Sequence, residues 1–447
     1  MPWRWVERLS RPVDVASLAA FRVIFGGLLF VAVMRHWAKG GIHDAFVAPR
    51  FFFPYPGLDW LKPLPGIGMY VVYAAIGLLA LAYAAGAAFR ASALALFVLF
   101  TYAHLADAAN YLNHYHLVSL LLLVTAFLPL NASASVDARL RPSLARATVP
   151  AWVLWLVRAQ IGAVYFFGGV AKLKADWLLS AMPLKIWLAT AGDFPVLGPL
   201  LRWPEAPYVM SWLGAAFDLS APFLLSIRRT RPFAYAVVCF FHLVTARLFQ
   251  IGMFPWIMMG ATLLFFEPSW PRRLSPRLFE ATEHDAGADS GRRSRGLALA
   301  AAWLAVQLVV PLRHWAYGTD AAGTALLWSE EGYRFSWNVM LMEKTGSAEL
   351  VARDPKTGAV REIRLRDWLT PFQVKMMSTQ PDMIAAFAQH VAREAEERGE
   401  PRPEIYADVL VTLNGRAPAR LIDPKADLAR VDDGPLARRR WVLPPPR

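Results

Sequence analysis

The sequence predicts a mainly α-helical protein, with a polytopic transmembrane helical bundle of about nine spans followed by a small C-terminal α+β extramembrane domain. The first observation is composition, because 56% of the 447 residues are hydrophobic and only 18% are charged. A soluble domain cannot bury that much apolar surface. The second is that apolar residues fall in runs long enough to cross a bilayer. The third is a change of pattern near Trp315, where short alternating segments replace the long runs.

Nine apolar runs fill most of the first 314 residues, which we take as the membrane domain. They cover approximately residues 17–35, 66–86, 89–106, 113–130, 151–171, 207–227, 231–249, 250–266 and 296–312. The basic start of the chain resembles a signal peptide, but the run after it is long and no convincing small-residue cleavage site follows. We therefore expect a retained first span.

Basic residues between the runs predict the orientation. In a nine-span arrangement the loops on the N-terminal side hold about twice as many Lys and Arg residues as the opposite loops. The positive-inside rule then places the protein in the cell (inner) membrane with a cytoplasmic N-terminus and an extracytoplasmic C-terminal domain.

The C-terminal domain is expected over residues 315–447. Residues 280–295, which precede the last predicted span of the membrane domain, are polar and aperiodic, and this predicts a loop. Alternation of apolar side chains predicts strands at 333–342, 348–353 and 359–365, and the DPKTG sequence predicts a hairpin turn between the last two. Helical spacing predicts a helix at 381–398. Further strands are expected at 405–413 and 420–422.

Several classes of function receive no support from the sequence. The net charge of +13 is spread over membrane loops rather than gathered in one patch, so no nucleic-acid partner is predicted. Cys239 is the only cysteine, which excludes intramolecular disulfides and thiolate metal sites. His114 and His116 are two residues apart, the wrong spacing for chelation from one helical face, and no HExxH motif occurs. We therefore predict no metal site.

The sequence YFFGGVAKLKADW, from Tyr165, places Lys172 directly after a membrane-length apolar run. An ammonium there must reach the headgroups, pair with another group, or sit neutral in an enclosed site where it can act as a base. Gly168 and Gly169 allow another backbone or a flat ligand to approach closely. Sequence physics leaves membrane anchor and buried base equally supported.

Other polar residues lie inside predicted spans. His114, His242 and Lys172 come from three different runs, and convergence on one internal cavity would satisfy all three. Arg158 precedes Lys172 by 14 residues, about 21 Å along a helix. Asp218 is a candidate counter-charge for Arg158. The aromatic and methionine-rich segment 250–259 indicates helix packing and would also suit a quinone ring.

Eight blocks of sequence resemble the vitamin K-dependent gamma-carboxylases and their bacterial relatives with the horizontally transferred transmembrane (HTTM) domain. In chain order they are RPVDVASLAAFRVIFGGLL (from Arg11), NHYHLVSLLL (Asn113), RAQIGAVYFFGGVAKLKADW (Arg158), FDLSAPFLL (Phe217), FHLVTARLFQIGMF (Phe241), PSWPRRL (Pro268), SWNVM (Ser336) and PEIYADVLVTLNGRAPARLIDPKADL (Pro403). Their shared order is far more specific than any single motif.

The resemblance implies a lyase-class carboxylase with coupled epoxidase activity. Its cofactor would be reduced vitamin K, a naphthohydroquinone, with O₂ and CO₂ as co-substrates, and its partner a glutamate-containing peptide or protein. Lys172 would deprotonate the quinol, and the oxygenated quinone would remove the γ-proton because no side chain is basic enough. His114 would assist the carbanion and CO₂ step. Asn113 and His242 would line the cofactor site, with Arg158 and Asp218 beside them.

The chain also departs from the animal enzymes of this family. It has Ala171 before Lys172 where they have two adjacent lysines, Asn338 where they have an acidic residue, and a much shorter C-terminal part. Two other functions therefore stay open at this point. One is a quinol oxygenase or epoxidase acting on a different carbon acid, and the other is a non-catalytic membrane protein that binds or transports a lipid or quinone.

Overall fold

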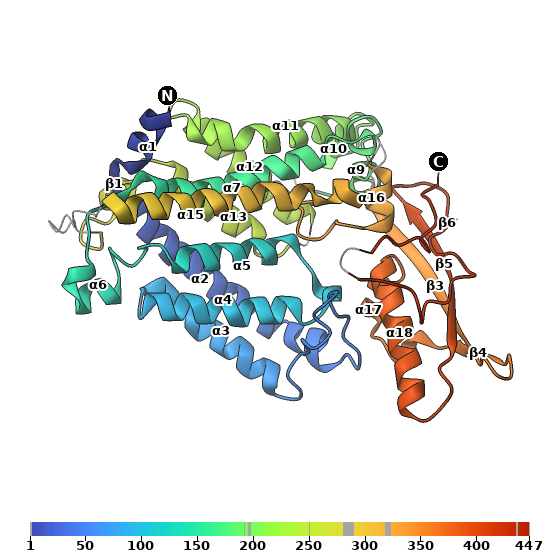
Figure 1. Cartoon of the computed structure of the whole chain (residues 1–447). Coiled ribbons are helices and arrows are strands. Elements are labelled where there is room, and N and C mark those ends of the chain that lie inside the picture. The colour runs from blue at the N-terminus through green and yellow to red at the C-terminus, as the bar shows by residue number, and fades with distance from the viewer. Residues whose placement is uncertain are drawn as a thin grey trace.

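The computed structural model describes residues 2–191, 193–194, 198–249, 251–279, 290–317, 323–434 and 437–446. A bundle of long helices occupies the N-terminal part of the chain, and a smaller unit with a β-sheet lies at one end of it (Figure 1). The predicted mainly helical class with a small C-terminal α+β part is thus confirmed.

The long helices follow the predicted apolar runs. They are α2 (Ala16–Ala38), α3 (Gly68–Ala85), α4 (Phe89–Leu105), α5 (Asn113–Ala126), α7 (Ala151–Ala171), α11 (Ala206–Ser226), α12 (Arg231–Leu248), α13 (Phe254–Thr262) and α15 (Ser290–Val309). Shorter α-helices connect them: α1 (Pro2–Ser10), α6 (Val136–Leu140), α8 (Ala175–Leu178), α9 (Leu184–Leu188), α10 (Gly198–Leu201), α14 (Trp270–Leu274) and α16 (Thr324–Ser329). The segments of 3₁₀ or π type are η1 (His43–Val47), η2 (Ala108–Asn110), η3 (Pro142–Leu144), η4 (Leu263–Phe265), η5 (Val310–Tyr317) and η6 (Leu365–Asp367).

The chain is a membrane protein, but the count of about nine spans is not confirmed. Within the described ranges, five helical segments are long and apolar enough to cross a membrane: Ala16–Ala38, Gly68–Ala85, Ala151–Ala171, Ala206–Ser226 and Arg295–Tyr317. Phe89–Leu105 and Phe254–Phe265 are apolar but shorter, and α5 has only 14 residues. The sequence runs overestimate helix length because apolar residues continue into turns, as they do where α13 becomes the 3₁₀ turn η4.

The predicted loop 280–295 is wrong in its last six residues. Residues 280–289 lie outside the described residues, whereas Ser290–Arg295 already form the beginning of α15. Their polarity hid the helix because a helix that starts outside the apolar layer does not need an apolar face.

The C-terminal sheet is antiparallel with strand order β4-β3-β5-β6. Its strands are β3 (Lys344–Arg353), β4 (Val360–Ile363), β5 (Glu404–Leu413) and β6 (Ala419–Arg420), and Leu350 lies opposite both Ile363 and Ala407. Helices α17 (Pro371–Met377) and α18 (Pro381–Glu397) pack beside it (Figure 1). Alternate β5 residues from Ile405 to Leu413 are buried, so this face of the sheet forms the core of the unit. These elements match the predicted strands 348–353, 359–365 and 405–413 and the predicted helix.

Three details of the strand prediction differ from the structure. The predicted strand 333–342 is wrong: Phe335, Trp337 and Met340 have left-handed backbone angles, with φ of 60°, 56° and 53°, which an extended strand cannot contain. At 420–422 the strand ends at Arg420, and Ile422 makes an isolated bridge to Val442. The short pair β1 (Pro12–Asp14) and β2 (Thr148–Pro150) was not predicted.

Candidate functional site

Lys172 lies at the C-terminal end of α7 and is buried, with 6% of its surface exposed. Its Nζ donates to the Gly168 carbonyl at 3.2 Å and to Asp218 Oδ2 at 2.7 Å. The Trp177 ring lies 5.4 Å from Nζ. The side chain therefore pairs inside the protein rather than reaching toward lipid headgroups.

Two glycines of α7 explain how Asp218 reaches this lysine. A Cβ on Gly169 would lie 2.7 Å from the backbone nitrogen of Leu219, and one on Gly168 would lie 3.7 Å from Asp218 Oδ2. Because neither glycine has a side chain, α11 packs directly against α7. The close approach expected from the GG pair is therefore made by a neighbouring helix.

A second pair lies two helical turns away on α7. Tyr165 OH and His242 Nε2 are 2.8 Å apart, and both residues are buried. His242 Nδ1 is buried and makes no hydrogen bond among the described residues. The Phe254 ring contacts His242 at 5.9 Å and His114 at 5.6 Å between ring centroids, so both histidines lie against the same phenylalanine.

Asn113 is oriented by the C-terminal part of the chain. Its Nδ2 donates to the Asn338 carbonyl at 3.0 Å, and its Oδ1 accepts from Tyr111 OH at 2.9 Å. Tyr111 OH in turn accepts from the Phe335 backbone N–H at 2.6 Å. We call residues 333–338 the junction segment, because it fixes the first turn of α5 from outside the bundle.

The loop after Lys172 is also held from the C-terminal unit. In this lysine loop, residues 172–177, the Asp176 carboxylate accepts from Arg416 Nη1 at 2.8 Å and Nη2 at 2.6 Å, and from Asn414 Nδ2 at 2.8 Å. Burial works to raise the pKa of Asp176, but the hydrogen bonds from Arg416 and Asn414 outweigh it and lower that pKa. The carboxylate thus stays charged and holds the loop in place.

Arg158 is the sequence-predicted residue that the structure does not bring to this cluster. Its guanidinium donates to the carbonyls of Leu264 at 2.7 Å and Phe266 at 3.0 Å, where it satisfies the end of the turn η4. The pairing considered for Arg158 and Asp218 is not formed, because Asp218 pairs with Lys172. Gln250, in the predicted quinone-compatible segment, lies outside the described residues.

The structure thus pairs Lys172 with Asp218 and places His242 and His114 against the same Phe254 ring. Sequence reasoning missed Tyr165, Phe254 and the Asp176 clamp. Tyr165 could have been found, because it precedes Lys172 by seven residues and so shares its helical face. The other two depend on contacts between distant segments.

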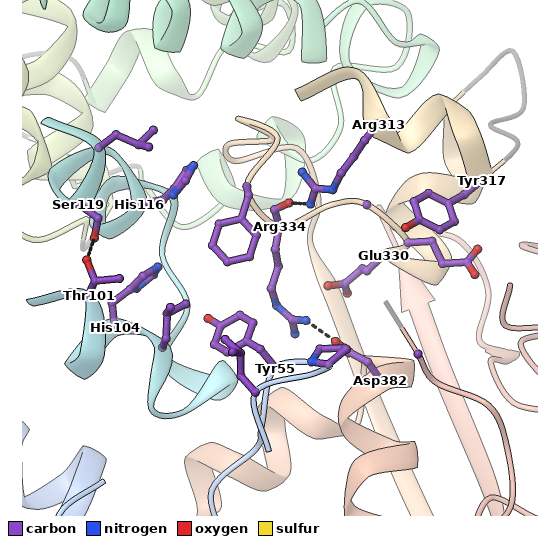
Figure 2. Close-up of a pocket in the computed structure, with 18 of the residues that line it drawn as sticks. Tyr55, Thr101, His104, His116, Ser119, Arg313, Tyr317, Glu330, Arg334 and Asp382 are labelled. Carbon is purple, nitrogen blue, oxygen red and sulfur yellow. Dashed lines mark hydrogen bonds and ion pairs between the residues drawn. The ribbon is translucent and has the colours of Figure 1, made fainter. Parts of the chain in front are cut away.

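A separate cavity of about 480 Å³ lies at the end of the bundle, where α4 and α5 face η5 and the junction segment (Figure 2). His104 and His116 line its bundle side, and Arg313 and Arg334 line the opposite side. His116 contacts the Phe335 ring at 4.9 Å. His114 and His116, two positions apart on α5, therefore have different neighbours: His114 contacts Phe254, whereas His116 lines this cavity.

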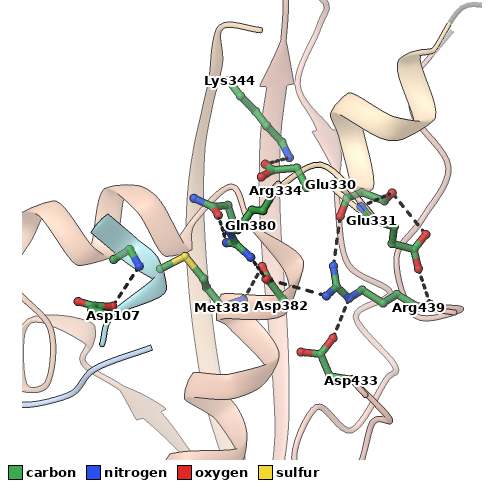
Figure 3. A network of polar contacts seen from close by, with 12 residues as sticks. Asp107, Glu330, Glu331, Arg334, Lys344, Gln380, Asp382, Met383, Asp433 and Arg439 are labelled. Atoms are coloured by element: carbon green, nitrogen blue, oxygen red, sulfur yellow. Dashed lines mark hydrogen bonds and ion pairs between the residues drawn. The ribbon is translucent and has the colours of Figure 1, made fainter. Parts of the chain in front are cut away.

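A network of ion pairs joins the outer wall of this cavity to the C-terminal unit (Figure 3). Arg334 pairs with Asp382, and Arg439 Nε lies 2.7 Å from Asp433 Oδ1. Burial works to raise the pKa of Asp382, but the charges of Arg334 and Arg439 hold it at about 2. Burial raises the pKa of Asp433 to about 6.

Asp107 lies nearby and joins three segments of chain. Its carboxylate accepts from the backbone N–H groups of Phe53 and Ala109 and, at 3.4 Å, from Gln373 Nε2 of α17. Burial raises the pKa of Asp107 to about 7 in spite of these hydrogen bonds. No group of three or more potential metal-ligating side chains occurs in the part of the chain that the structure describes.

Comparison with known proteins gives two matches that together cover most of the chain. A family model described as the HTTM domain matches residues 10–270. A second, described as the lumenal domain of vitamin K-dependent gamma-carboxylase, matches residues 292–447. No solved structure matches the chain.

Proposed function

The chain belongs to the vitamin K-dependent gamma-carboxylase family, and from this premise we propose that it is an integral-membrane carboxylase of glutamyl residues. It would use reduced vitamin K, O₂ and CO₂ and act on a glutamate-containing peptide or protein. The observation that carries the proposal is the buried Lys172–Asp218 pair, because it places an ionisable amine and a proton acceptor together inside the bundle.

The residues around this pair are compatible with a flat hydroxylated ring. His242 Nδ1 is a buried polar atom without a hydrogen-bond partner among the described residues. Phe217, Phe241 and Phe254 supply apolar ring faces close to Tyr165 and His242. When bound, the quinol would supply the strong base that the chemistry requires, since no side chain is basic enough to remove the γ-proton of glutamate.

Lys172 and Asp218 would manage the first proton. An amine accepts a proton only when it is neutral, so the ammonium must first lose one. Asp218 Oδ2, at 2.7 Å from Nζ, can take that proton without changing the total charge of the buried pair. We assign Lys172 as the initiating base and Asp218 as the residue that positions the lysine and accepts its proton.

His114 would serve the later carbon chemistry, and its neighbour Asn113 would help to orient the cofactor. The carbonyl of Asn338 and the hydroxyl of Tyr111 fix the Asn113 amide, and His114 follows it on the same turn of α5. We assign His114 to the carbanion and CO₂ step, with Asn113 and His242 orienting the cofactor. Arg158 is left out of this set because backbone carbonyls hold its guanidinium elsewhere.

For the topology we propose about nine membrane passages within residues 1–314, with α5 and α13 as short ones, and an extramembrane domain over residues 315–447. We propose that the protein lies in the inner membrane of the cell. The charge bias of the loops supports a cytoplasmic N-terminus. Lys172 would then lie near the extracytoplasmic end of α7. The glutamyl substrate would arrive from the side of the C-terminal domain.

The test uses the full chain in lipid nanodiscs with reduced vitamin K, labelled CO₂ and a glutamate-rich peptide. Wild-type protein should form quinone epoxide and incorporate label. Lys172→Ala and Lys172→Arg should both lose epoxide formation, because arginine keeps the charge but cannot release its proton. Lys174→Ala, two residues further along, is the matched control and should keep activity.

Three results would redirect the proposal. Epoxide without labelled peptide would favour an oxygenase acting on another carbon acid. Quinone binding without any turnover would favour a non-catalytic binding or transport protein. Full activity of Lys172→Arg, with unchanged folding, would remove Lys172 from the role of base.

A further inference from the structure

The cavity of Figure 2 is lined by His104 and His116 and not by Lys172, Asp218 or His114, and the proposed reaction gives it no role. We propose that it is a binding site for one anionic membrane phospholipid, with the phosphate at the outer end and part of an acyl chain between α4 and α5. The volume of about 480 Å³ is within the range of small-molecule sites and holds a headgroup with a short length of chain.

The cavity changes from polar to apolar along the two helices. On α4 its wall runs from His104 through Thr101 to Phe97, and on α5 from His116 to Leu123. The two ends of each run are seven positions apart, which corresponds to about 10 Å of helix. The apolar residues lie further from the C-terminal unit than the histidines do, as expected for a ligand whose tail points into the bilayer.

At the polar end, Arg313 is the one arginine of the wall without a counter-ion among the described residues. Arg313 lies on η5, and its guanidinium donates to Ser336 Oγ at 2.9 Å and to the carbonyls of Val310 and Arg334. No carboxylate of the described residues lies within ion-pair distance of it. The other two arginines of the wall, Arg334 and Arg439, are paired with aspartates.

The acids of the wall do not neutralise Arg313. Asp382 is paired with Arg334, and Glu330 lies 2.9 Å from Lys344. Glu331 accepts the backbone N–H of Arg439 at 2.8 Å and also lines a second, smaller cavity. An arginine that always carries its charge gains most from an anionic ligand in such a position.

His104 gives a second, independent sign of a ligand. It is 5% exposed, and neither ring nitrogen makes a hydrogen bond within the described ranges. A buried imidazole without partners loses the hydrogen bonds that water gave it, which destabilises the empty site. A phosphate or glycerol oxygen in the cavity would restore them.

Charge and shape together favour a phospholipid over the two proposed substrates. A reduced quinone is uncharged and would leave Arg313 without a counter-ion. A glutamyl side chain could pair with Arg313 but has no chain to fill the space between Phe97 and Leu123. An anionic lipid satisfies both ends.

Occupancy of this site would reach the reaction site through the junction segment. Phe335 and Trp337 contact His116 on the cavity side of α5, while the Asn338 carbonyl holds Asn113 on the other side. The left-handed angles of Phe335 and Trp337 cost energy and need support from their surroundings. A bound lipid would add that support.

The test measures lipid retention and needs no turnover, so it stands apart from the proposed reaction. The full chain is placed in nanodiscs of equal parts phosphatidylglycerol and phosphatidylcholine. The protein is then released from the nanodiscs, and native mass spectrometry identifies the lipids that it retains. Wild-type protein should keep one phosphatidylglycerol in preference to phosphatidylcholine. Arg313→Gln should lower that preference about tenfold, which is ~1.4 kcal/mol. Arg247→Gln, which removes a cation outside the cavity, should not.

A second variant guards against misfolding of the first. Leu120→Trp leaves the guanidinium intact and fills the apolar end, so it should also lose the retained lipid. Equal retention of both lipids by wild-type protein, or unchanged retention by both cavity variants, would overturn the proposal. Displacement by soluble glycerol phosphate would show a site for free anions instead, and displacement by a glutamate-rich peptide a substrate site; either overturns the assignment to a lipid.

Discussion

The buried pair of Lys172 and Asp218 allows a double-mutant cycle with a clear expectation. Their side chains are 8% and 9% exposed, so water screens them little. Replacing one partner leaves the other buried without a counter-charge, which costs about 3–5 kcal/mol. We expect Lys172→Met and Asp218→Leu each to lose ~3 kcal/mol, the lower end, because the remaining group can neutralise itself by gaining or losing a proton. The double variant should regain most of this loss.

The assay is equilibrium unfolding in mixed micelles, with the free energy of unfolding compared among the four proteins. A coupling energy of at least ~2 kcal/mol is expected, because contacting buried charges are strongly non-additive. Additivity within ~0.5 kcal/mol would mean that the two groups do not interact in the folded protein. The reasoning that makes Asp218 the proton acceptor would then fail, whatever the activity of the variants.

Three further predictions address other parts of the molecule. Arg416→Ala should destabilise the protein by about 2–5 kcal/mol in the same unfolding assay, because it leaves the lysine-loop carboxylate without its bidentate partner; Arg420→Ala, which breaks an exposed ion pair, should cost less than about 1 kcal/mol. Asp107→Asn should remove part of the pH dependence of unfolding. The pKa of Asp107 in the folded protein, about 7, lies above its value in the unfolded chain. Between about pH 4 and 7 the folded state therefore keeps a proton that the unfolded state loses, and the stability of the wild-type protein falls as pH rises through that window. Parallel pH profiles of wild type and variant would contradict this. Tyr165→Phe should leave quinone affinity within a few-fold but lower epoxide formation by tenfold or more, since it frees the buried His242 Nε2; equal loss of binding and turnover would indicate a structural role alone.

The sequence predicted the membrane class, the helical runs and most of the candidate residues, but not their partners. Lys172 and Asp218 were both candidates, yet Asp218 was expected opposite Arg158. The correct pairing depends on the packing of α7 against α11 at Gly169, and nothing in either segment alone specifies it. Helix periodicity places a residue on a face, whereas the neighbour of that face is a tertiary property.

The junction segment shows a different kind of failure. Apolar side chains at Tyr333, Phe335 and Trp337 alternate as they would in a strand, and the sequence prediction followed that alternation. In the structure Phe335 and Trp337 have positive φ, and their rings pack against His104 and His116 of the bundle instead of a neighbouring strand. A period of two therefore arose from contacts with helices α4 and α5. Departures from local sequence rules are concentrated where a chain serves function, and this segment contacts Asn113 as well.

The C-terminal unit holds the membrane site from two directions. Arg416 and Asn414 fix Asp176, four residues after Lys172, and the Asn338 carbonyl fixes Asn113, one residue before His114. The proposed base and the residue proposed for carbon chemistry come from helices α7 and α5, and the C-terminal unit contacts the ends of both. The geometry of the site therefore depends on a domain that supplies none of its proposed reacting groups. A bundle without that domain would keep Lys172 and His114 but lose the contacts that set their separation.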